Sequence, residues 1–434
     1  MTKEEYLGYK EVKAGVKEKG WHCTRTDKSS QLVLNTLENY RSSVLPHTAK
    51  DHPSSLEEVI KSEGLLYDHV AALVRIFAIG RENPGEPDRI ISSMKPVFSG
   101  APGLEGAPKD HKTGWDLAVG PPTRGLVNGN VGPNAATGNL TAKMLKPVRI
   151  QMNKQQGTSL CSREELLRAI SDTNEKLQQR VGLPQRLPRA CSRRDIQGNE
   201  LVVGSMDADA LYPSCKVKEA AAHVREGIRT SGVDFIGVDK RFMSRYIAIT
   251  RGKTGTAVDK FLPTPKGTTT LHSLVERDAP GQFWEAEQDP SFMTEGEKNQ
   301  LVGWVLTEAL EVTYGNHFYT AGGVVYRQHD GGPQGLDTAV EASEVYMLSF
   351  DKKYLAKLDA LGIRVDLYVR YVDDITIIIM AIRPGGYWDG KLRHDANHPT
   401  KDLPGDQRTM EILVAIANTV DKLNLHSGLP FQEL

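Results

Sequence analysis

Two apolar stretches, residues 365–369 and 375–379, flank the tetrapeptide Tyr371-Val372-Asp373-Asp374. Two β-rich runs joined by a tight acidic turn are typical of a β-hairpin with two carboxylates at its tip. Adjacent carboxylates repel each other, and burying an unpaired charge is costly. We therefore expect a divalent cation to neutralise the pair. The alternative that this segment alone leaves open is a solvent-exposed Asp-Asp turn.

A second acidic cluster follows an apolar run over residues 201–206, which ends at Asp207-Ala208-Asp209. A strand that ends in an acidic residue is where open α/β proteins place their chemistry. Hard oxygen ligands suit Mg²⁺ or Mn²⁺, and no cluster of His and Cys offers a softer site. Asp207 from one strand and Asp373 from the hairpin are expected to hold two metal ions, a pair that stabilises the attacking and leaving oxygens of a phosphoryl transfer.

The order and spacing of three motifs resemble those of reverse transcriptases. Residues 207–212, with Asp207 five positions before Tyr212, resemble motif A. The run GGPQG at 331–335, followed by a long helix-compatible stretch, resembles motif B, and YVDD at 371–374 resembles motif C. Further upstream, the runs TDKS, KDHK and PPTR and the later run YRQ resemble motifs of the Penelope-like family; they occupy 26–29, 109–112, 121–124 and 326–328.

This resemblance implies an α+β chain with the right-hand fold of polymerases. We expect an antiparallel palm sheet with helices on one face, together with fingers and an N-terminal helical extension. The expected division is a partly helical extension over residues 1–95, fingers over 96–205 and a palm over 206–434. The palm would carry an insertion at about 235–300, and the chain would stop before the thumb and endonuclease of the resembled family.

The resemblance also assigns roles to individual residues. Asp207 and Asp373 would bridge two Mg²⁺ or Mn²⁺ ions, Asp374 would be a weaker or outer ligand, and the backbone carbonyl of Ala208 would complete one coordination sphere. These three aspartates are the expected catalytic residues. A general acid for pyrophosphate is expected from a lysine after motif C, with Lys422 as the first candidate and Lys401 and Lys391 as alternatives.

The remaining assignments concern substrate contacts. Arg124 would clamp the triphosphate through its forked guanidinium, with Lys112 adding a point charge. Tyr212 matches a steric gate that excludes a ribose 2′-OH, although it also fits an ordinary core position. The other expected contacts are Gln334 and Gly335 against the nucleotide, where glycine lets the backbone approach closely, and Tyr371 beside the primer end.

The chain departs from the family after motif B. Glu341 and Glu344 follow closely, and Asp209 replaces an often basic residue, so we expect extra negative charge near the nucleotide. Two alternatives therefore stay open: an impaired retroelement remnant that only binds nucleic acid, and an RNA-dependent RNA polymerase. Tyr212 and Tyr371 argue against the second, whose hairpin usually reads Gly-Asp-Asp.

Composition adds limits on the partners. A net charge of −1 argues against a uniformly basic nucleic-acid binder but allows a local groove. Residues 109–154 hold seven Lys/Arg and two Asp, a balance of +5 that fits such a groove or a merely solvated face. Four dispersed cysteines, no signal peptide and no membrane-length apolar run predict an intracellular protein. We expect a nuclear location, and as partners an RNA or DNA template with primer and deoxynucleoside triphosphates.

Helix-capping and turn signals predict the remaining elements. Residues 55–58 and 162–165 read as caps of helices that run to about 80 and 180, and residues 294–297 cap a helix over 298–314. Residues 318–328 alternate like a strand pair, and a helix is expected over 337–361. The stretch 81–138 is rich in Gly and Pro, which is typical of loops and short strands.

Overall fold

The computed structural model describes residues 10–25, 32–94, 100–109, 122–180, 200–208, 211–246, 294–360, 365–381 and 431–433, with interruptions of one or two residues. The chain forms two compact units. Unit 1 comprises Met1–Ala142 and Phe235–Ala339, and unit 2 comprises Lys143–Asp234 and Val340–Leu434. Lys422 and most of the expected insertion lie outside the described residues. The division into extension, fingers and palm stays a prediction.

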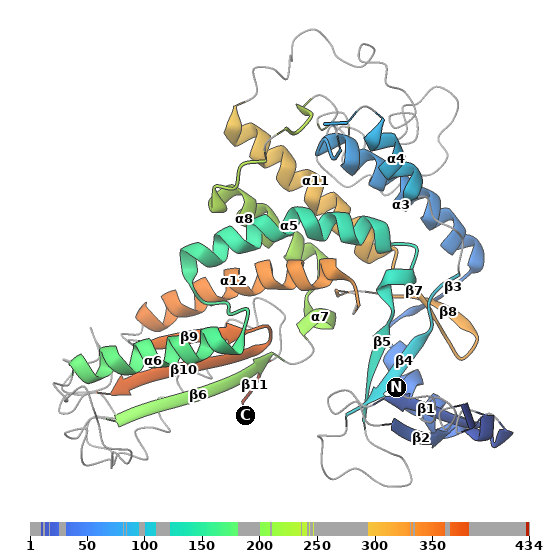
Figure 1. Ribbon diagram of the computed structural model, residues 1–434, viewed down its shortest axis with the longest axis horizontal. Coiled ribbons are helices and arrows are strands. Elements are labelled where there is room, and N and C mark those ends of the chain that lie inside the picture. The colour runs from blue at the N-terminus through green and yellow to red at the C-terminus, as the bar shows by residue number, and fades with distance from the viewer. Residues whose placement is uncertain are drawn as a thin grey trace. The chain divides into compact units, whose positions relative to one another are not determined.

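Unit 1 combines helices with three small antiparallel sheets (Figure 1). The sheets have the strand orders β1-β2, β3-β8-β7 and β4-β5. Their strands are β1 Trp21–Arg25, β2 Leu32–Thr36, β3 His52–Ser54, β4 Leu104–Pro108, β5 Thr123–Val127, β7 Phe318–Ala321 and β8 Val324–Arg327. The helical elements that the structure delimits in this unit include α2 Leu37–Val44, η1 Leu45–Thr48, α3 Leu56–Ile76, α4 Glu86–Ser93, η2 Gly129–Val131 and α11 Glu295–Gly315.

Capping boxes start the two long helices of unit 1, as predicted. The Ser55 hydroxyl accepts the Glu58 N–H at 3.2 Å, and the Glu58 carboxylate accepts the Ser55 N–H at 3.0 Å. Thr294 and Glu297 form the same reciprocal pair at the start of α11. Each box satisfies amide groups that have no partner within the first turn of a helix. The predicted strand pair over 318–328 is also present as β7 and β8, joined at Gly322-Gly323.

Unit 2 is built on one antiparallel sheet of strand order β11-β6-β10-β9 (Figure 1). These strands are β6 Glu200–Ala208, β9 Leu367–Tyr371, β10 Asp374–Ala381 and β11 Phe431–Glu433. The helices are α6 Arg163–Arg180, α7 Leu211–Ser214 and α8 Val217–Ser231, with α5 Ala135–Gln156 and α12 Asp337–Ala360 beginning in unit 1 and continuing in unit 2. In β11, Phe431 lies opposite Ala208 on β6.

One face of this sheet is covered. Ile375, Ile377 and Ile379 alternate along β10 and are buried, and β9 places Tyr368 and Arg370 opposite the first two. Both β9 side chains contact Asp351 of α12, so this helix lies against the covered face. The mixture of helices with antiparallel sheets agrees with the predicted α+β class. No helix among the described residues is both long and apolar enough to cross a bilayer.

Helices α4 and α5 were not predicted. α4 falls within the stretch 81–138, where Gly and Pro signals indicated loops or short strands, and α5 begins at the end of that stretch. α4 carries its proline in the first turn, where no amide partner is lost. α5 contains Pro147 in its interior, a position that removes one helical hydrogen bond. Its apolar residues Leu145, Val148 and Met152 are buried, and this packing offsets the proline.

Candidate active site

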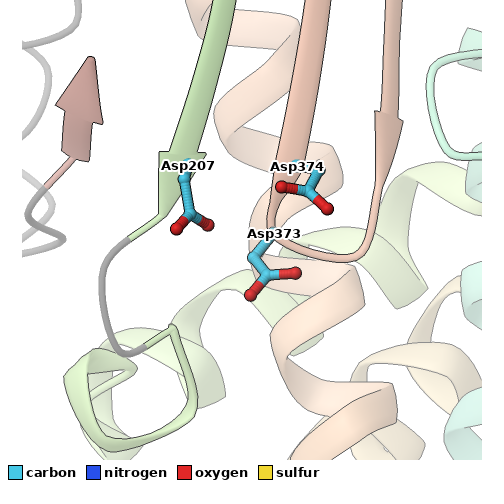
Figure 2. Close-up of side chains that lie close together, drawn as sticks. All are labelled: Asp207, Asp373 and Asp374. Atoms are coloured by element: carbon cyan, nitrogen blue, oxygen red, sulfur yellow. The ribbon is translucent and has the colours of Figure 1, made fainter. Parts of the chain in front are cut away.

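Three aspartates of unit 2 come together at one end of its sheet. Asp207 lies near the end of β6, Asp374 begins β10, and Asp373 lies in the turn between β9 and β10. Asp374 is the direct cross-strand partner of Asp207. One carboxylate oxygen of each residue lies within 4.8 Å of those of the other two. Figure 2 shows the three side chains converging on the space between the ends of the two strands. The predicted convergence is therefore present.

The backbone of the turn is fixed from the neighbouring strand. The amide of Ala208 donates to the carbonyl of Asp373 at 3.2 Å, so the peptide that follows Asp373 is tied to β6. Val372, just before Asp373, has φ +59°, in the left-handed region. A β-branched residue rarely adopts this conformation, which persists only where the surrounding structure enforces it. The turn thus depends on tertiary contacts to present Asp373.

The donor set fits Mg²⁺ or Mn²⁺. All three ligand groups are carboxylates, the hard oxygen donors that these ions prefer. Asp207 and Asp373 are partly exposed and Asp374 is exposed, so water and substrate oxygens can complete a coordination sphere. Two ions in a catalytic pair lie about 3.5–4 Å apart, a separation that ligands this close together can serve.

Two of the expected substrate contacts also lie in unit 2. Tyr371 is 50% exposed and is the cross-strand partner of Asp374, which places both on the same face of the sheet. Tyr212 lies in α7, five residues after Asp207, and is partly buried. Contacts of Tyr371 with a primer and of Tyr212 with a sugar stay predictions.

The other expected contacts belong to unit 1 or lie outside the described residues. Arg124 is an exposed residue of β5. Gly335 has φ +94°, and a Cβ there would overlap the carbonyl oxygen of Val127, so the close approach that requires glycine is to the backbone of β5. Lys112 and Gln334 lie outside the described residues. The nucleotide contacts of all four stay predictions.

The expectation of extra negative charge from Glu341 and Glu344 is wrong, because both carboxylates are in ion pairs. Glu341 accepts from Arg149 of α5 at 2.6 Å. Glu344 is buried and pairs with Arg370 of β9 at 3.0 Å. Neither ion pair was predicted from the sequence, and Arg370 was assigned no role. Arg149 is engaged by Glu341, and the exposed basic residues of α5 are Lys143, Lys146 and Lys154.

Comparisons with known proteins give structural similarity only. No family model matches the chain, and no curated protein matches it. Among solved structures, telomerase from Candida albicans in complex with the TWJ fragment of telomeric RNA is 10% identical with a TM-score of 0.48, over 99% of this chain. Two structures of apo telomerase from Candida tropicalis, one truncated from the C-terminal domain, are each 10% identical, with TM-scores of 0.44 over 95% of this chain and 0.47 over 98%. This chain spans 52–59% of the length of those chains. With TM-scores below 0.5, the function proposed below rests on the chain's own residues.

Proposed function

We propose that this chain is an RNA-directed DNA polymerase that transfers deoxynucleotidyl groups to a primer 3′-OH. The observation that carries the proposal is the convergence of Asp207, Asp373 and Asp374, with carboxylate oxygens within 4.8 Å of one another at the end of an antiparallel sheet. The motif order along the sequence supports the same function, because YVDD at 371–374 supplies two of these aspartates and the motif A segment supplies the third.

Asp207 and Asp373 would hold two Mg²⁺ or Mn²⁺ ions, with Asp374 as a weaker ligand and the Ala208 carbonyl as a further one. When bound, two such ions activate the attacking 3′ oxygen and stabilise the charge on the leaving pyrophosphate. The protein's own part is positional. The ladder between β6 and β10 fixes Asp207 against Asp374, and the Ala208 amide fixes the backbone after Asp373.

The substrates follow from the same proposal. Arg124 and Lys112 would bind the triphosphate, and Tyr212 would select the deoxyribose. Gln334 and Gly335 would lie against the nucleotide, and Tyr371 would lie beside the primer end. The template would be RNA or DNA. The right-hand arrangement of fingers and palm, membership of the Penelope-like group and a nuclear location belong to this proposal on the strength of the motifs alone.

Primer extension by the full chain tests the proposal. A labelled primer is annealed to matched RNA and DNA templates and incubated with deoxynucleotides or ribonucleotides in Mg²⁺ or Mn²⁺. We expect template-directed incorporation of deoxynucleotides on the RNA template. Incorporation of ribonucleotides in preference would indicate an RNA polymerase instead. Tight template binding without incorporation in either metal would support a binding remnant and contradict the proposed reaction.

A further inference from the structure

Arg370 is the largest fully buried side chain among the described residues, with 0% of its surface exposed. It lies in β9, two residues before Val372, where the turn between β9 and β10 begins. Burial alone lowers the pKa of this guanidinium, but the ion pairs with Asp351 and Glu344 outweigh that effect and raise the pKa overall. The group is therefore charged at every physiological pH. A buried charge of this kind is costly unless its donors are paired.

The guanidinium is held from one side by α12. Its Nη1 and Nη2 atoms donate to the two carboxylate oxygens of Glu344 at 3.0 and 3.2 Å, a bidentate pair. Its Nε donates to Asp351 at 3.2 Å. Glu344 and Asp351 are seven residues apart, or about two helical turns, so they lie on the same face of α12. One cation thus faces two carboxylates.

Neighbouring hydroxyl groups orient these carboxylates. The Ser159 hydroxyl donates to Glu344 at 3.0 Å, and the Thr158 hydroxyl donates to Asp351 at 3.0 Å. The Tyr368 hydroxyl donates to Asp351 at 2.7 Å. With its acceptors fixed in this way, the plane of the guanidinium has little freedom to rotate.

A further hydrogen bond of the Arg370 guanidinium is directed at the turn. Nη1 also donates to the carbonyl oxygen of Val372 at 2.6 Å. That carbonyl belongs to the peptide that joins Val372 to Asp373, so the contact sets the orientation of the peptide that follows the left-handed residue Val372. Because Ala208 binds the carbonyl of Asp373, the peptides on both sides of Asp373 are fixed.

We infer that Arg370 is a positioning residue that holds Asp373 in ligand geometry through the Val372 carbonyl, with Glu344 and Asp351 as its anchors. The catalytic consequence rests on the proposed function, whereas the effect on metal affinity does not. A purely stabilising role explains this arrangement less well, since a buried ion network is a weak source of stability compared with apolar packing. Groups that hydrogen-bond metal ligands directly contribute about 10- to 100-fold to metal affinity or activity, and a contact that orients the peptide before Asp373 is expected to act at the lower end of this range.

The test uses Arg370→Lys and Arg370→Gln in the full chain. Lysine keeps the charge that Glu344 and Asp351 require but lacks the fork that reaches Val372 at the same time. The matched control is Arg149→Gln. This substitution breaks the ion pair with Glu341, which belongs to α12 as Glu344 and Asp351 do, and it leaves the turn untouched. For each protein we would measure thermal unfolding, the dissociation constant for Mn²⁺ by electron paramagnetic resonance, and kcat and KM in primer extension.

We expect Arg370→Lys to fold, to bind Mn²⁺ about 10-fold or more weakly, and to lose kcat with little change in KM for the primer–template. Arg149→Gln should bind Mn²⁺ as the wild-type chain does, even if it is equally destabilised. Mn²⁺ affinity in Arg370→Lys equal to that of the control would overturn the inference, and this comparison holds if Arg370→Gln fails to fold. A wild-type chain that binds Mn²⁺ but extends no primer would refute the proposed function and leave the metal comparison intact.

Discussion

Asp374 lies directly opposite Asp207 in the ladder between β10 and β6, so two carboxylates occupy one cross-strand pair at the end of the sheet. Like charges in this position destabilise a sheet, and Asp373 adds a third carboxylate from the turn. A bound cation that neutralises the three carboxylates would therefore stabilise the folded chain. The same closeness of carboxylates that opposes folding without metal would bind divalent cations.

The first prediction concerns stability with and without metal. Asp207→Asn and Asp374→Asn should each raise the melting temperature in EDTA, because each removes one of the repelling charges. Both should reduce the stabilisation by Mg²⁺, which for the wild-type chain reaches about 2.7 kcal/mol at 100 times the dissociation constant. Thermal unfolding with and without Mg²⁺ measures both effects. Asp172→Asn, an exposed position on α6, is the control, and an equal response in this variant would contradict a specific site.

The second prediction concerns sugar choice. Tyr212→Ala should admit ribonucleotides and leave the use of deoxynucleotides largely intact, because the smaller side chain opens room for a 2′-OH. The ratio of kcat/KM for the two nucleotide types measures this selectivity, with deoxynucleotide incorporation as the internal control. If the ratio does not change, Tyr212 has a packing role within unit 2 and the RNA polymerase alternative gains support.

The third prediction concerns the triphosphate. Arg124→Ala should raise the KM for the incoming nucleotide by about tenfold or more, the loss expected when a charged hydrogen bond is removed. Template affinity should change less. Arg89→Ala provides the control, since Arg89 is an exposed arginine of the same unit that pairs with Glu86 three residues earlier on α4. A variant whose nucleotide KM is normal but whose template binding becomes more sensitive to salt would identify Arg124 as a backbone-phosphate contact instead.

The fourth prediction concerns pH. Burial lowers the pKa of His69 to about 3 and that of His317 to about 4. Below the ordinary histidine pKa, the unfolded chain therefore binds more protons than the folded chain. The stability of the fold that depends on these neutral histidines is fully present above that pKa and is lost as the pH falls toward 4. Between pH 7 and pH 5 the free energy of unfolding should fall by about 2 kcal/mol for each histidine.

Urea unfolding of the full chain at pH 7 and pH 5 measures this change. In the wild-type chain, Nδ1 of His69 lies 2.8 Å from the hydroxyl oxygen of Tyr246. His69→Gln removes one titrating group and keeps a polar side chain beside this hydroxyl. In this variant, the free energy of unfolding should fall less between pH 7 and pH 5, by the contribution of His69. A variant with the pH dependence of the wild-type chain would show that His69 is not buried in its neutral form.

Features encoded over short distances in the sequence were predictable. The helices that begin at Ser55 and Thr294 carry their own capping boxes, and the hairpin around Asp373 carries its apolar strands and acidic turn. Each of these signals lies within about ten residues of the element it specifies. The proximity of Asp207 to Asp373 and Asp374 was predicted from the order of the motifs. No local signal indicates this contact, because the residues are far apart in the sequence.

Features that depend on packing between distant segments were not predictable. α5 was not predicted, and it contains Pro147, whose lost helical hydrogen bond is offset by the burial of the surrounding apolar residues. Glu344 was read as an unpaired charge because its partner Arg370 follows 26 residues later on another element. The role inferred for Arg370 depends on the distance to the carbonyl of Val372, which the tertiary contacts of α12 and β9 determine.

The measurement that tests the proposed chemistry most directly is single-turnover incorporation of one deoxynucleotide onto a primer annealed to RNA, with wild-type protein and with Asp373→Asn. We expect incorporation by the wild-type chain in Mg²⁺ and none in EDTA. Asp373→Asn should lower the rate by about 10³-fold or more, as removal of a catalytic group does, with unchanged affinity for the primer–template. Incorporation by Asp373→Asn at the wild-type rate, or no incorporation by the wild-type chain in Mg²⁺ or Mn²⁺, would contradict a catalytic centre built on these three aspartates.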